Sequence, residues 1–389
     1  MQSQQSRHII LIIALLIAVS LVIMLSLLLH RRIGNNTKTT STHAALLAAK
    51  ADYDSTSYFM PPEESLHEGT WLQWPHNYGF DRHHIHRYES TWIQMTRELN
   101  RGENVHIIAY DMVEKERIKN ILASYADIDM NKVSFVIGKT DDVWVRDNGP
   151  IFVFDTNKPL GQQLMIQNWS FNGWGYKAEY KHCNNIPILV GNELNLPRID
   201  IDMVNEGGSI ELDGRGTLMA KQSSILNKNR NPGWTLDDVE SYFRYYLGVR
   251  NFIWLKGTKG HDITDDHIDG TARFANGDTI VTYYPYDSDT KEYNILKNAK
   301  DINGKKYSIV HLPVTSKKLR QLRDYGTYIN YYVANEVVLV PKYNDPNDGI
   351  AIDVIQKLYP SRRVVGVEAI QLAKDGGMIH CVTQQQPLV

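Results

Sequence analysis

GGMIHCVTQQQP, residues 376–387, closes a chain of 389 residues and contains one of its two cysteines, Cys381. Chain ends are often frayed, so this stretch is either bound into the fold or incidental to it. Two interpretations of Cys381 are open at this point. As a small hydrophobic residue it would be buried in a C-terminal strand, the commoner place for a free cysteine. As a nucleophile it would use Gly376 and Gly377, which let a substrate or a second backbone come close.

The composition of the whole chain is that of a globular protein. Hydrophobic residues make up 42% of the sequence and charged residues 22%, which is enough apolar material for a large core. The formal net charge of −2 gives no reason to expect a nucleic-acid partner. Two cysteines are too few for a disulfide scaffold, and no CxxC, HExxH, P-loop or GxGxxG pattern occurs. The usual sequence signs of a metal, phosphate or dinucleotide site are therefore missing.

The N-terminal segment differs from the rest of the chain. Residues 9–29 carry no charge, and a helix of that length spans about 30 Å, the thickness of a bilayer's hydrocarbon layer. The apolar run continues directly into His30, Arg31 and Arg32, without a cleavage site of small residues. We therefore expect a single-pass membrane anchor with the larger part of the protein on the extracytoplasmic side. The expected organisation is an anchor at 1–33, a polar linker at 34–52 and a globular domain at 53–389.

Strand-like and helix-like patterns alternate through this domain. Runs rich in β-branched and aromatic residues predict strands at 105–110, 133–137, 151–154, 163–169, 279–284, 307–312 and 337–340. Amphipathic stretches predict helices at 91–99, 114–125, 236–247 and 349–358. This alternation indicates an α/β fold.

Four further stretches place polar side chains beside glycines and strand-like runs. They are DDVWVRDNGPIFVF at 141–154, NEGGSIELDGRGTLMA at 205–220, GHDITDDHIDGTARFA at 260–275 and NWSFNGWGYKAEY at 168–180. The first three contain Asp147, Glu206 and the pair His267 and Asp269, which would share one face of an extended segment. Each residue also has an ordinary structural explanation. Asp147 could pair with Arg146, Glu206 could cap a turn, and His267 could lie in a solvated loop.

Taken together with Cys381, these residues provide one thiol, one imidazole and three carboxylates. A guanidinium ion is always charged and presents its N–H donors in a fixed fork, which paired carboxylates can accept. Its central carbon is a poor electrophile, so a strong nucleophile such as a thiolate is needed to attack it. A histidine can protonate the departing ammonia and then activate water, while another carboxylate holds that histidine. The set predicts a thiol enzyme that acts on such a cation.

The same stretches resemble the agmatine deiminase and bacterial-type peptidylarginine deiminase family, within the guanidino-group-modifying superfamily. Six stretches carry the resemblance, in the family's order and over nearly the whole domain: TWLQWP (70–75), VWVRDNGP (143–150), NEGGSIELDGRGT (205–217), LNKNRNPG (226–233), DHIDGTARF (266–274) and GGMIHCVTQQQP (376–387). The resemblance implies a five-fold pseudo-symmetric α/β propeller of the pentein type with a central active site. In this picture residues 53–389 form the catalytic domain.

The resemblance also implies a role for each candidate residue. Cys381 would be the nucleophile that forms a covalent amidino intermediate, and His267 would be the general acid and then the base. Glu206 would orient His267. The guanidinium would be bound by Asp147 and Asp269, with Trp144 as a further substrate-binding residue. No cofactor and no metal are implied, and the expected substrate is agmatine, which would give N-carbamoylputrescine and ammonia.

Other functions remain as alternatives at this stage. The sequence reads DHIDG where agmatine deiminases of the family commonly read GHVDN, so Asp266 and Gly270 depart from the pattern. The substrate could instead be another small guanidine or peptidyl-arginine, or the enzyme could be an amidinotransferase that uses the same cysteine. A membrane-tethered guanidine-binding protein would need only the carboxylates, whereas Cys381 and His267 are both present. The oligomeric state is not predicted.

A cluster of histidines suggests one more alternative, a metal site. His83, His84 and His86 lie within DRHHIHRYE at 81–89, but they lack the usual spacing of metal ligands. A solvated loop that leads into the helix expected at 91–99 explains them better.

Overall fold

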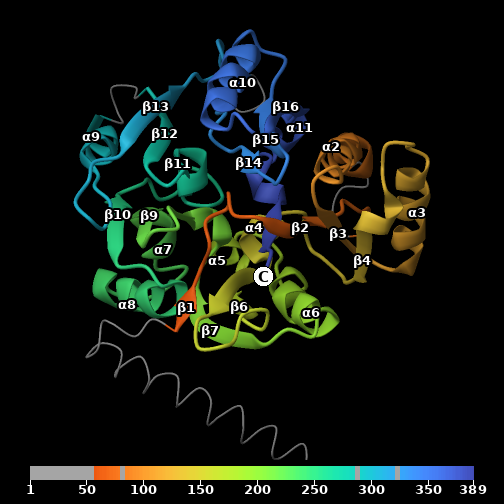
Figure 1. Ribbon diagram of the computed structural model, residues 1–389, viewed down its shortest axis with the longest axis horizontal. Coiled ribbons are helices and arrows are strands. Elements are labelled where there is room, and N and C mark those ends of the chain that lie inside the picture. The colour runs from red at the N-terminus through yellow and green to blue at the C-terminus, as the bar shows by residue number, and fades with distance from the viewer. Residues whose placement is uncertain (1–56, 79–83, 285–289, 320–324) are drawn as a thin grey trace, which may run out of the picture. The chain divides into compact units, whose positions relative to one another are not determined.

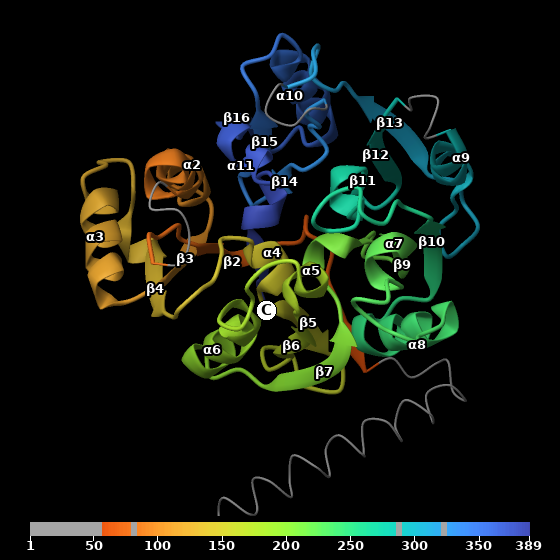
Figure 2. The same cartoon turned by 180° about the vertical axis from the view of Figure 1, so that it is seen from behind.

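Five separate sheets form a ring in the computed structural model, which describes residues 57–78, 84–284, 290–319 and 325–389. Figure 1 shows these sheets arranged around a common centre, and Figure 2 shows the same arrangement from behind. In each sheet one antiparallel pair of strands is followed by a parallel strand. The domain is therefore a five-fold repeat of one supersecondary module.

Four modules are continuous in the chain, and each one has two strands, then one or two helices, then a third strand. The first module consists of β5 (Ile151–Asp155), β6 (Leu164–Ser170), α6 (Ile186–Glu193) and β7 (Arg198–Val204), and the second of β8 (Ile210–Leu212), β9 (Thr217–Lys221), α7 (Gln222–Ile225), α8 (Leu236–Leu247) and β10 (Asn251–Leu255). The third consists of β11 (Ala272–Ala275), β12 (Thr279–Tyr283), α9 (Thr290–Asn298) and β13 (Ser308–Leu312). The fourth consists of β14 (Tyr332–Val333), β15 (Val337–Lys342), α10 (Asn347–Leu358) and β16 (Arg363–Glu368). A helix that connects two parallel strands is the ordinary βαβ crossover.

The fifth module joins the two ends of the domain. The C-terminal strand β17 (Gln384–Pro387) pairs antiparallel with β2 (His67–Gln73), so that Gln385 lies opposite Thr70. The module continues through α2 (His84–Leu99), β3 (Asn104–Ala109), α3 (Met112–Ala123) and β4 (Val133–Ile137), and β1 (Tyr58–Phe59) is added to the edge of β5. Side chains of β17 bond to the rest of the domain: Trp71 donates from Nε1 to Gln386 Oε1 over 2.9 Å, and Gln384 donates from Nε2 to the carbonyl of Pro150 over 2.9 Å. The C-terminal stretch is therefore bound into the fold.

Apolar sequence runs place the strands in the core, and capping residues set the ends of helices. In β15, Val337, Val338, Leu339 and Val340 are all almost fully buried, as expected of a central strand covered on both faces. Helix α8 begins with a capping box, in which Thr235 and Asp238 each bond to the other's backbone N–H. It ends at Gly248, whose φ of 73° is the left-handed conformation that favours glycine.

The predicted secondary structure agrees with these elements. Each of the seven predicted strands coincides with a strand of the model, from β3 and β4 to β15. The four predicted helices overlap α2, α3, α8 and α10. The α/β propeller predicted for the domain is the fold that the model shows.

The structure does not support the predicted membrane anchor. Among the described residues, no helix has the length and apolar character needed to cross a membrane. The longest of them, α2, has 16 residues, which span about 24 Å, and its sequence is amphipathic and not continuously apolar. The apolar stretch at 9–29 and the linker at 34–52 lie outside the described residues. The fold class is corrected to the propeller alone, and the membrane localisation that rested on the anchor is withdrawn.

Candidate active site

Short segments that lead into the first strand of each module meet at the centre of the ring. These segments are α4 (Val145–Asn148), η3 (Gly207–Ser209), η4 (Ile268–Gly270), the loop before β14, and η6 (His380–Val382). Asp147, Asp269 and Cys381 lie within these segments, Glu206 and His267 immediately precede η3 and η4, and Asn330 lies in the loop before β14. Each module thus contributes at least one polar or nucleophilic side chain from the same place in its repeat.

Gly208 marks the point at which these side chains converge. A Cβ atom added there would lie 2.7 Å from Nδ1 of His267, 2.9 Å from Oδ1 of Asp147 and 3.0 Å from Oδ2 of Asp269. Contacts that short do not occur at real Cβ atoms, so a glycine is required for these three groups to lie together. Gly208 also donates its N–H to Oδ1 of Asp147 over 2.9 Å.

His267 lies between two carboxylates. Its Nε2 is 3.1 Å from Oε2 of Glu206, and its Nδ1 is 3.7 Å from Oδ1 of Asp147. Burial works against the charged ring, but the carboxylates of Asp147 and Glu206 outweigh that effect and raise the pKa of His267 to about 9. The ring is therefore an imidazolium at neutral pH and can give a proton away.

Glu206 is fixed by an arginine on the side away from His267. Arg230 donates from Nε to Oε1 of Glu206 over 2.7 Å and from Nη1 to Oδ2 of Asp265 over 2.6 Å. All three side chains are buried. Although burial favours the neutral acid, the bonds from His267 and Arg230 hold the pKa of Glu206 below its usual range. Glu206 is thus a fixed anion behind His267.

Asp147 accepts bonds that fix both of its oxygens. Beside the Gly208 bond to Oδ1, Trp174 donates from Nε1 to Oδ2 over 2.9 Å. Trp174 comes from the glycine-rich aromatic stretch and lies in α5 (Gly173–Tyr176) with a φ of 55°. Burial raises the pKa of Asp147, with the neighbouring carboxylates of Asp269 and Glu206 adding to the effect. A cation placed beside Asp147 would relieve that repulsion.

The thiol of Cys381 faces Asp269. Sγ lies 3.8 Å from Oδ2 of Asp269 and 3.4 Å from Oδ1 of Asn330. Burial raises the pKa of Cys381 well above that of an ordinary thiol, and the negative charges of Asp269 and Asp147 raise it further. Without a cation beside it the sulfur is thus a thiol. A cation held by the same carboxylates would favour the thiolate.

Cys183, the other cysteine, is a buried structural residue. Its Sγ accepts the N–H of Asp141 over 3.2 Å and an N–H of Gln73 over 3.5 Å. Both cysteines are free, so the two do not pair.

Comparison with known proteins identifies the family. A model of the Porphyromonas-type peptidyl-arginine deiminase family matches residues 59–387. The chain belongs to this family. It is 33% identical over 349 residues to a putative agmatine deiminase of Streptomyces coelicolor, covering 85% of this chain and 99% of that protein. It is 30% identical over 370 residues to an agmatine deiminase of Medicago truncatula, covering 85% and 97%.

A solved structure agrees in fold with this deiminase. A cysteine-to-serine variant of the agmatine deiminase of C. jejuni, determined with substrate bound, superposes with a TM-score of 0.74 at 26% identity and covers 85% of this chain and 96% of that one. The predicted family and the predicted enzyme class, a deiminase that hydrolyses C–N bonds, are confirmed.

The structure brings together five of the six site residues predicted for this deiminase. Cys381, His267, Glu206, Asp147 and Asp269 all line the centre, although their roles stay predictions. Trp144 lies differently: its ring packs under Gly377, where an added Cβ would lie 2.4 Å from Cζ3 of the indole. Trp144 thus supports the segment that carries the cysteine, and its contact with substrate also stays a prediction.

Several residues of the site were missed in the sequence. Arg230 lies within the matched stretch 226–233 and Trp174 within the aromatic stretch 168–180. The sequence therefore marked both stretches, but it assigned no role to either residue. Asn330 lies in INYYV, a short apolar run that no motif covers, and only the five-fold repeat reveals it.

The departures from the family pattern have local explanations. Asp266 forms a salt bridge with Lys221 and accepts the N–H of Thr258 over 3.0 Å, so it is a structural ion-pair partner in this deiminase. At Gly270 no atom lies within 4 Å of where a Cβ would be, so the position has open space.

The structure does not test the metal site suggested by the histidine cluster. His83 and the side chains of His84 and His86 lie outside the described residues. Elsewhere in the described chain, no group of three or more side chains of the metal-ligating types could hold a metal ion.

Proposed function

We propose that this protein is an agmatine deiminase, which hydrolyses the guanidinium group of agmatine to N-carbamoylputrescine and ammonia. The observation that carries the proposal is the convergence of two carboxylates, an imidazolium and a thiol around Gly208. The curated relatives named as agmatine deiminases, at 30 and 33% identity over nearly their whole length, support agmatine as the substrate.

Asp147 and Asp269 bind the guanidinium. Both carboxylates are almost fully buried, and a planar cation between them donates paired charge-assisted hydrogen bonds to their oxygens in a water-poor site. The bound cation offsets the negative potential that keeps the Cys381 sulfur protonated. Substrate binding therefore generates the nucleophile, because the thiol gives up its proton to water only when the guanidinium is in place.

In the first half-reaction the sulfur of Cys381 replaces ammonia on the central guanidinium carbon. The thiolate of Cys381 attacks the central guanidinium carbon and forms a C–S bond. One nitrogen takes the proton of His267 and leaves as ammonia when its C–N bond breaks. The product is an amidino-thioether on Cys381, and the pKa of His267 near 9 supplies the acid form that this step needs.

The second half-reaction uses the same ring as a base. Water attacks the amidino carbon and gives one proton to the now neutral His267. Collapse of the tetrahedral intermediate breaks the C–S bond, releases the ureido product and returns the hydroxyl proton to the sulfur, which restores the thiol of Cys381. Glu206, fixed by Arg230, keeps His267 in place through both steps.

Ammonia release from the full-length chain tests the proposal. Agmatine, free arginine and an arginine-containing peptide are supplied separately to the wild type, to Cys381→Ser and to the matched control Cys183→Ser. We expect release from agmatine by the wild type and by Cys183→Ser, and none by Cys381→Ser. Release only from the peptide would replace agmatine with peptidyl-arginine. Release that appears only when an acceptor amine is added would point to an amidinotransferase.

A further inference from the structure

A second histidine lies beside the nucleophile and has no part in the chemistry described above. His380 precedes Cys381, and its side chain is 2% exposed. Its Nδ1 is 2.8 Å from Oδ2 of Asp269, and its Nε2 is 2.8 Å from Oε2 of Glu63. Both ring nitrogens thus face carboxylate oxygens, so the ring is held between Asp269 and Glu63.

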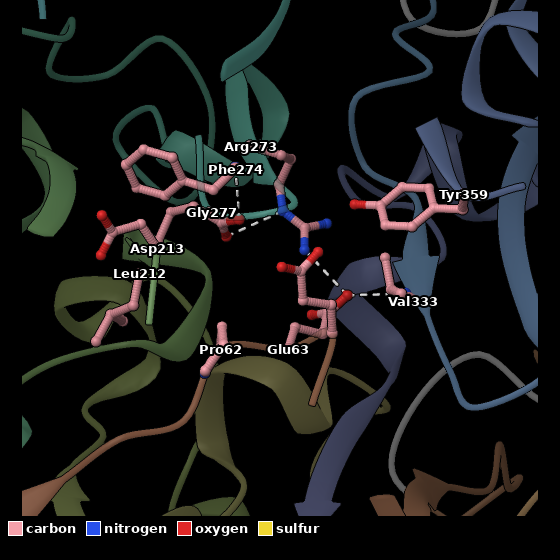
Figure 3. Close-up of a pocket in the computed structure, with 11 residues that line it drawn as sticks. Pro62, Glu63, Leu212, Asp213, Arg273, Phe274, Gly277, Val333 and Tyr359 are labelled. Atoms are coloured by element: carbon pink, nitrogen blue, oxygen red, sulfur yellow. Dashed lines mark hydrogen bonds and ion pairs between the residues drawn. The ribbon is translucent and has the colours of Figure 1, made fainter. Parts of the chain in front are cut away.

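Glu63 is anchored on its far side. Its Oε2 also accepts from Nη2 of Arg146 over 3.1 Å, and its Oε1 accepts from Nη2 of Arg273 over 3.0 Å and from the N–H of Val333 over 2.8 Å. Figure 3 shows Glu63 between Arg273 and the backbone of Val333 on the wall of a pocket. Burial opposes the charge, but Arg273, His380 and Arg146 together hold the pKa of Glu63 well below its usual range. The ring of His380 is therefore held against a fixed anion.

The backbone of His380 is fixed as well. Its N–H donates to Oδ1 of Asn330 over 3.0 Å, and its carbonyl accepts from Oγ1 of Thr383 over 3.0 Å. With both the main chain and the far ring nitrogen held, Nδ1 has one direction left in which to donate, toward Asp269.

Because of this contact the two carboxylate oxygens of Asp269 have different surroundings. Oδ2 accepts from His380 and also faces the thiol of Cys381 at 3.8 Å. Among the hydrogen bonds of the described residues, none uses Oδ1 of Asp269. The carboxylate is thus held by one oxygen, and the other oxygen is left to accept from the substrate.

We propose that His380, supported by Glu63, is a positioning residue: it fixes the rotation of Asp269 so that one carboxylate oxygen stays directed at the bound guanidinium. The inference deepens the proposed function and rests on it. Glu63 fixes His380, which in turn holds the substrate-binding carboxylate of Asp269. In the same way Arg230 fixes Glu206, which in turn holds His267. A merely space-filling role would not depend on which ring nitrogen can still donate.

Two substitutions separate the ring nitrogens. In His380→Asn the amide stands near the place of Nδ1 and can still donate to Asp269, whereas in His380→Gln it stands near Nε2 and can reach only Glu63. Both remove the imidazole and leave a similar volume. We expect His380→Asn to weaken agmatine binding by about threefold and His380→Gln by about thirtyfold or more.

Calorimetry on the full-length chain measures these effects, with Cys381→Ser as the parent so that no turnover occurs. The same two substitutions are then made in a protein that also carries Asp269→Asn. Because His380 acts through Asp269, each substitution should weaken agmatine binding by less than about twofold in that background. Equal weakening by the Asn and Gln variants would overturn the proposal. So would a His380→Gln effect that persists in full beside Asp269→Asn.

Folding is checked by thermal unfolding of each variant. If the His380 variants do not fold, Glu63→Gln replaces them. It keeps the shape of the side chain but removes the anion behind the ring, and it should weaken agmatine binding by about five- to tenfold beside native Asp269 and by less than about twofold beside Asp269→Asn. Equal effects in the two backgrounds would again overturn the proposal. Wild-type ammonia release is recorded separately, since its absence would count against the proposed function and not against the coupling of His380 to Asp269.

Discussion

Arg230 and Glu206 form a fully buried ion pair, with Nε of the arginine 2.7 Å from Oε1 of the carboxylate. Oε2, the other oxygen of Glu206, lies 3.1 Å from Nε2 of His267. A buried charge whose partner is removed is strongly destabilising, because neither water nor another group takes the partner's place. The pair therefore links the stability of the fold to the position of the acid–base histidine.

Removal of the arginine should cost stability. We expect Arg230→Gln to lower the free energy of unfolding by about 3–5 kcal/mol, since it removes the buried arginine that pairs with both Glu206 and Asp265. Arg198→Gln is the matched control: Arg198 pairs with Asp200 at the surface, and its loss should cost less than about 1 kcal/mol. Urea denaturation measures both. Similar small losses in the two variants would show that Arg230 is not needed to hold Glu206.

A methyl group at Gly208 should disable the site. The added Cβ would lie within 3.0 Å of side chains of His267, Asp147 and Asp269 at once, so Gly208→Ala must push them apart. A displacement of about 1 Å can cost a hundredfold in rate, and we expect at least that loss in kcat/KM for agmatine. Gly349→Ala, at an exposed helix position with no atom within 4 Å of the new Cβ, should keep full activity. An active Gly208→Ala enzyme would mean that these side chains are not the reacting groups.

The raised pKa of His267 predicts how stability depends on pH. The pKa rises from about 6.5 in the unfolded chain to about 9 in the fold, so the charged ring stabilises the folded state. This contribution is complete below pH 6.5 and is lost as the pH rises through 9, and it is on the order of 3 kcal/mol. The difference in unfolding free energy between the wild type and His267→Gln should therefore shrink between pH 6.5 and 9. A difference that stays constant over this range would show that His267 is not stabilised as a cation.

A cationic reagent should react with Cys381 faster than a neutral one of the same size. 2-Chloroacetamidine carries an amidinium that Asp147 and Asp269 can bind, whereas 2-chloroacetamide does not. Relative to free cysteine in solution, we expect the enzyme to favour the amidinium by about tenfold or more, because the cation offsets the charges that raise the pKa of the thiol. Mass spectrometry of the modified peptide gives both rates. Asp269→Asn should lose most of the preference; a preference equal to that of free cysteine would contradict substrate-assisted activation.

The sequence predicted the parts of the fold and of the site that depend on local pattern. Strands such as β15 are visible as apolar runs, and the five residues now found at the centre each stand in a recognisable motif. Their convergence could not be worked out from spacing, because Asp147 and Cys381 are far apart in the chain and meet only through the five-fold repeat. That part of the prediction came from the family resemblance.

The residues that were missed are defined by tertiary contacts alone. Glu63 lies in the loop after β1, which carries no recognisable motif. Its importance comes from ion pairs with Arg146, Arg273 and His380, which belong to three different modules. Asn330 is a single amide in an apolar run, with nothing local to mark it. The membrane anchor is the opposite case, in which a strong local pattern led to a prediction that the described structure does not support.

The central claim is that Cys381 carries the amidino group between the two half-reactions. Rapid acid quenching of full-length protein mixed with agmatine, followed by mass spectrometry of its peptides, tests it most directly. We expect the Cys381 peptide to gain the mass of agmatine less one ammonia during turnover, and no such adduct to form on Cys183. Turnover of agmatine with Cys381 unmodified at every quench time, and undiminished activity in Cys381→Ser, would contradict it.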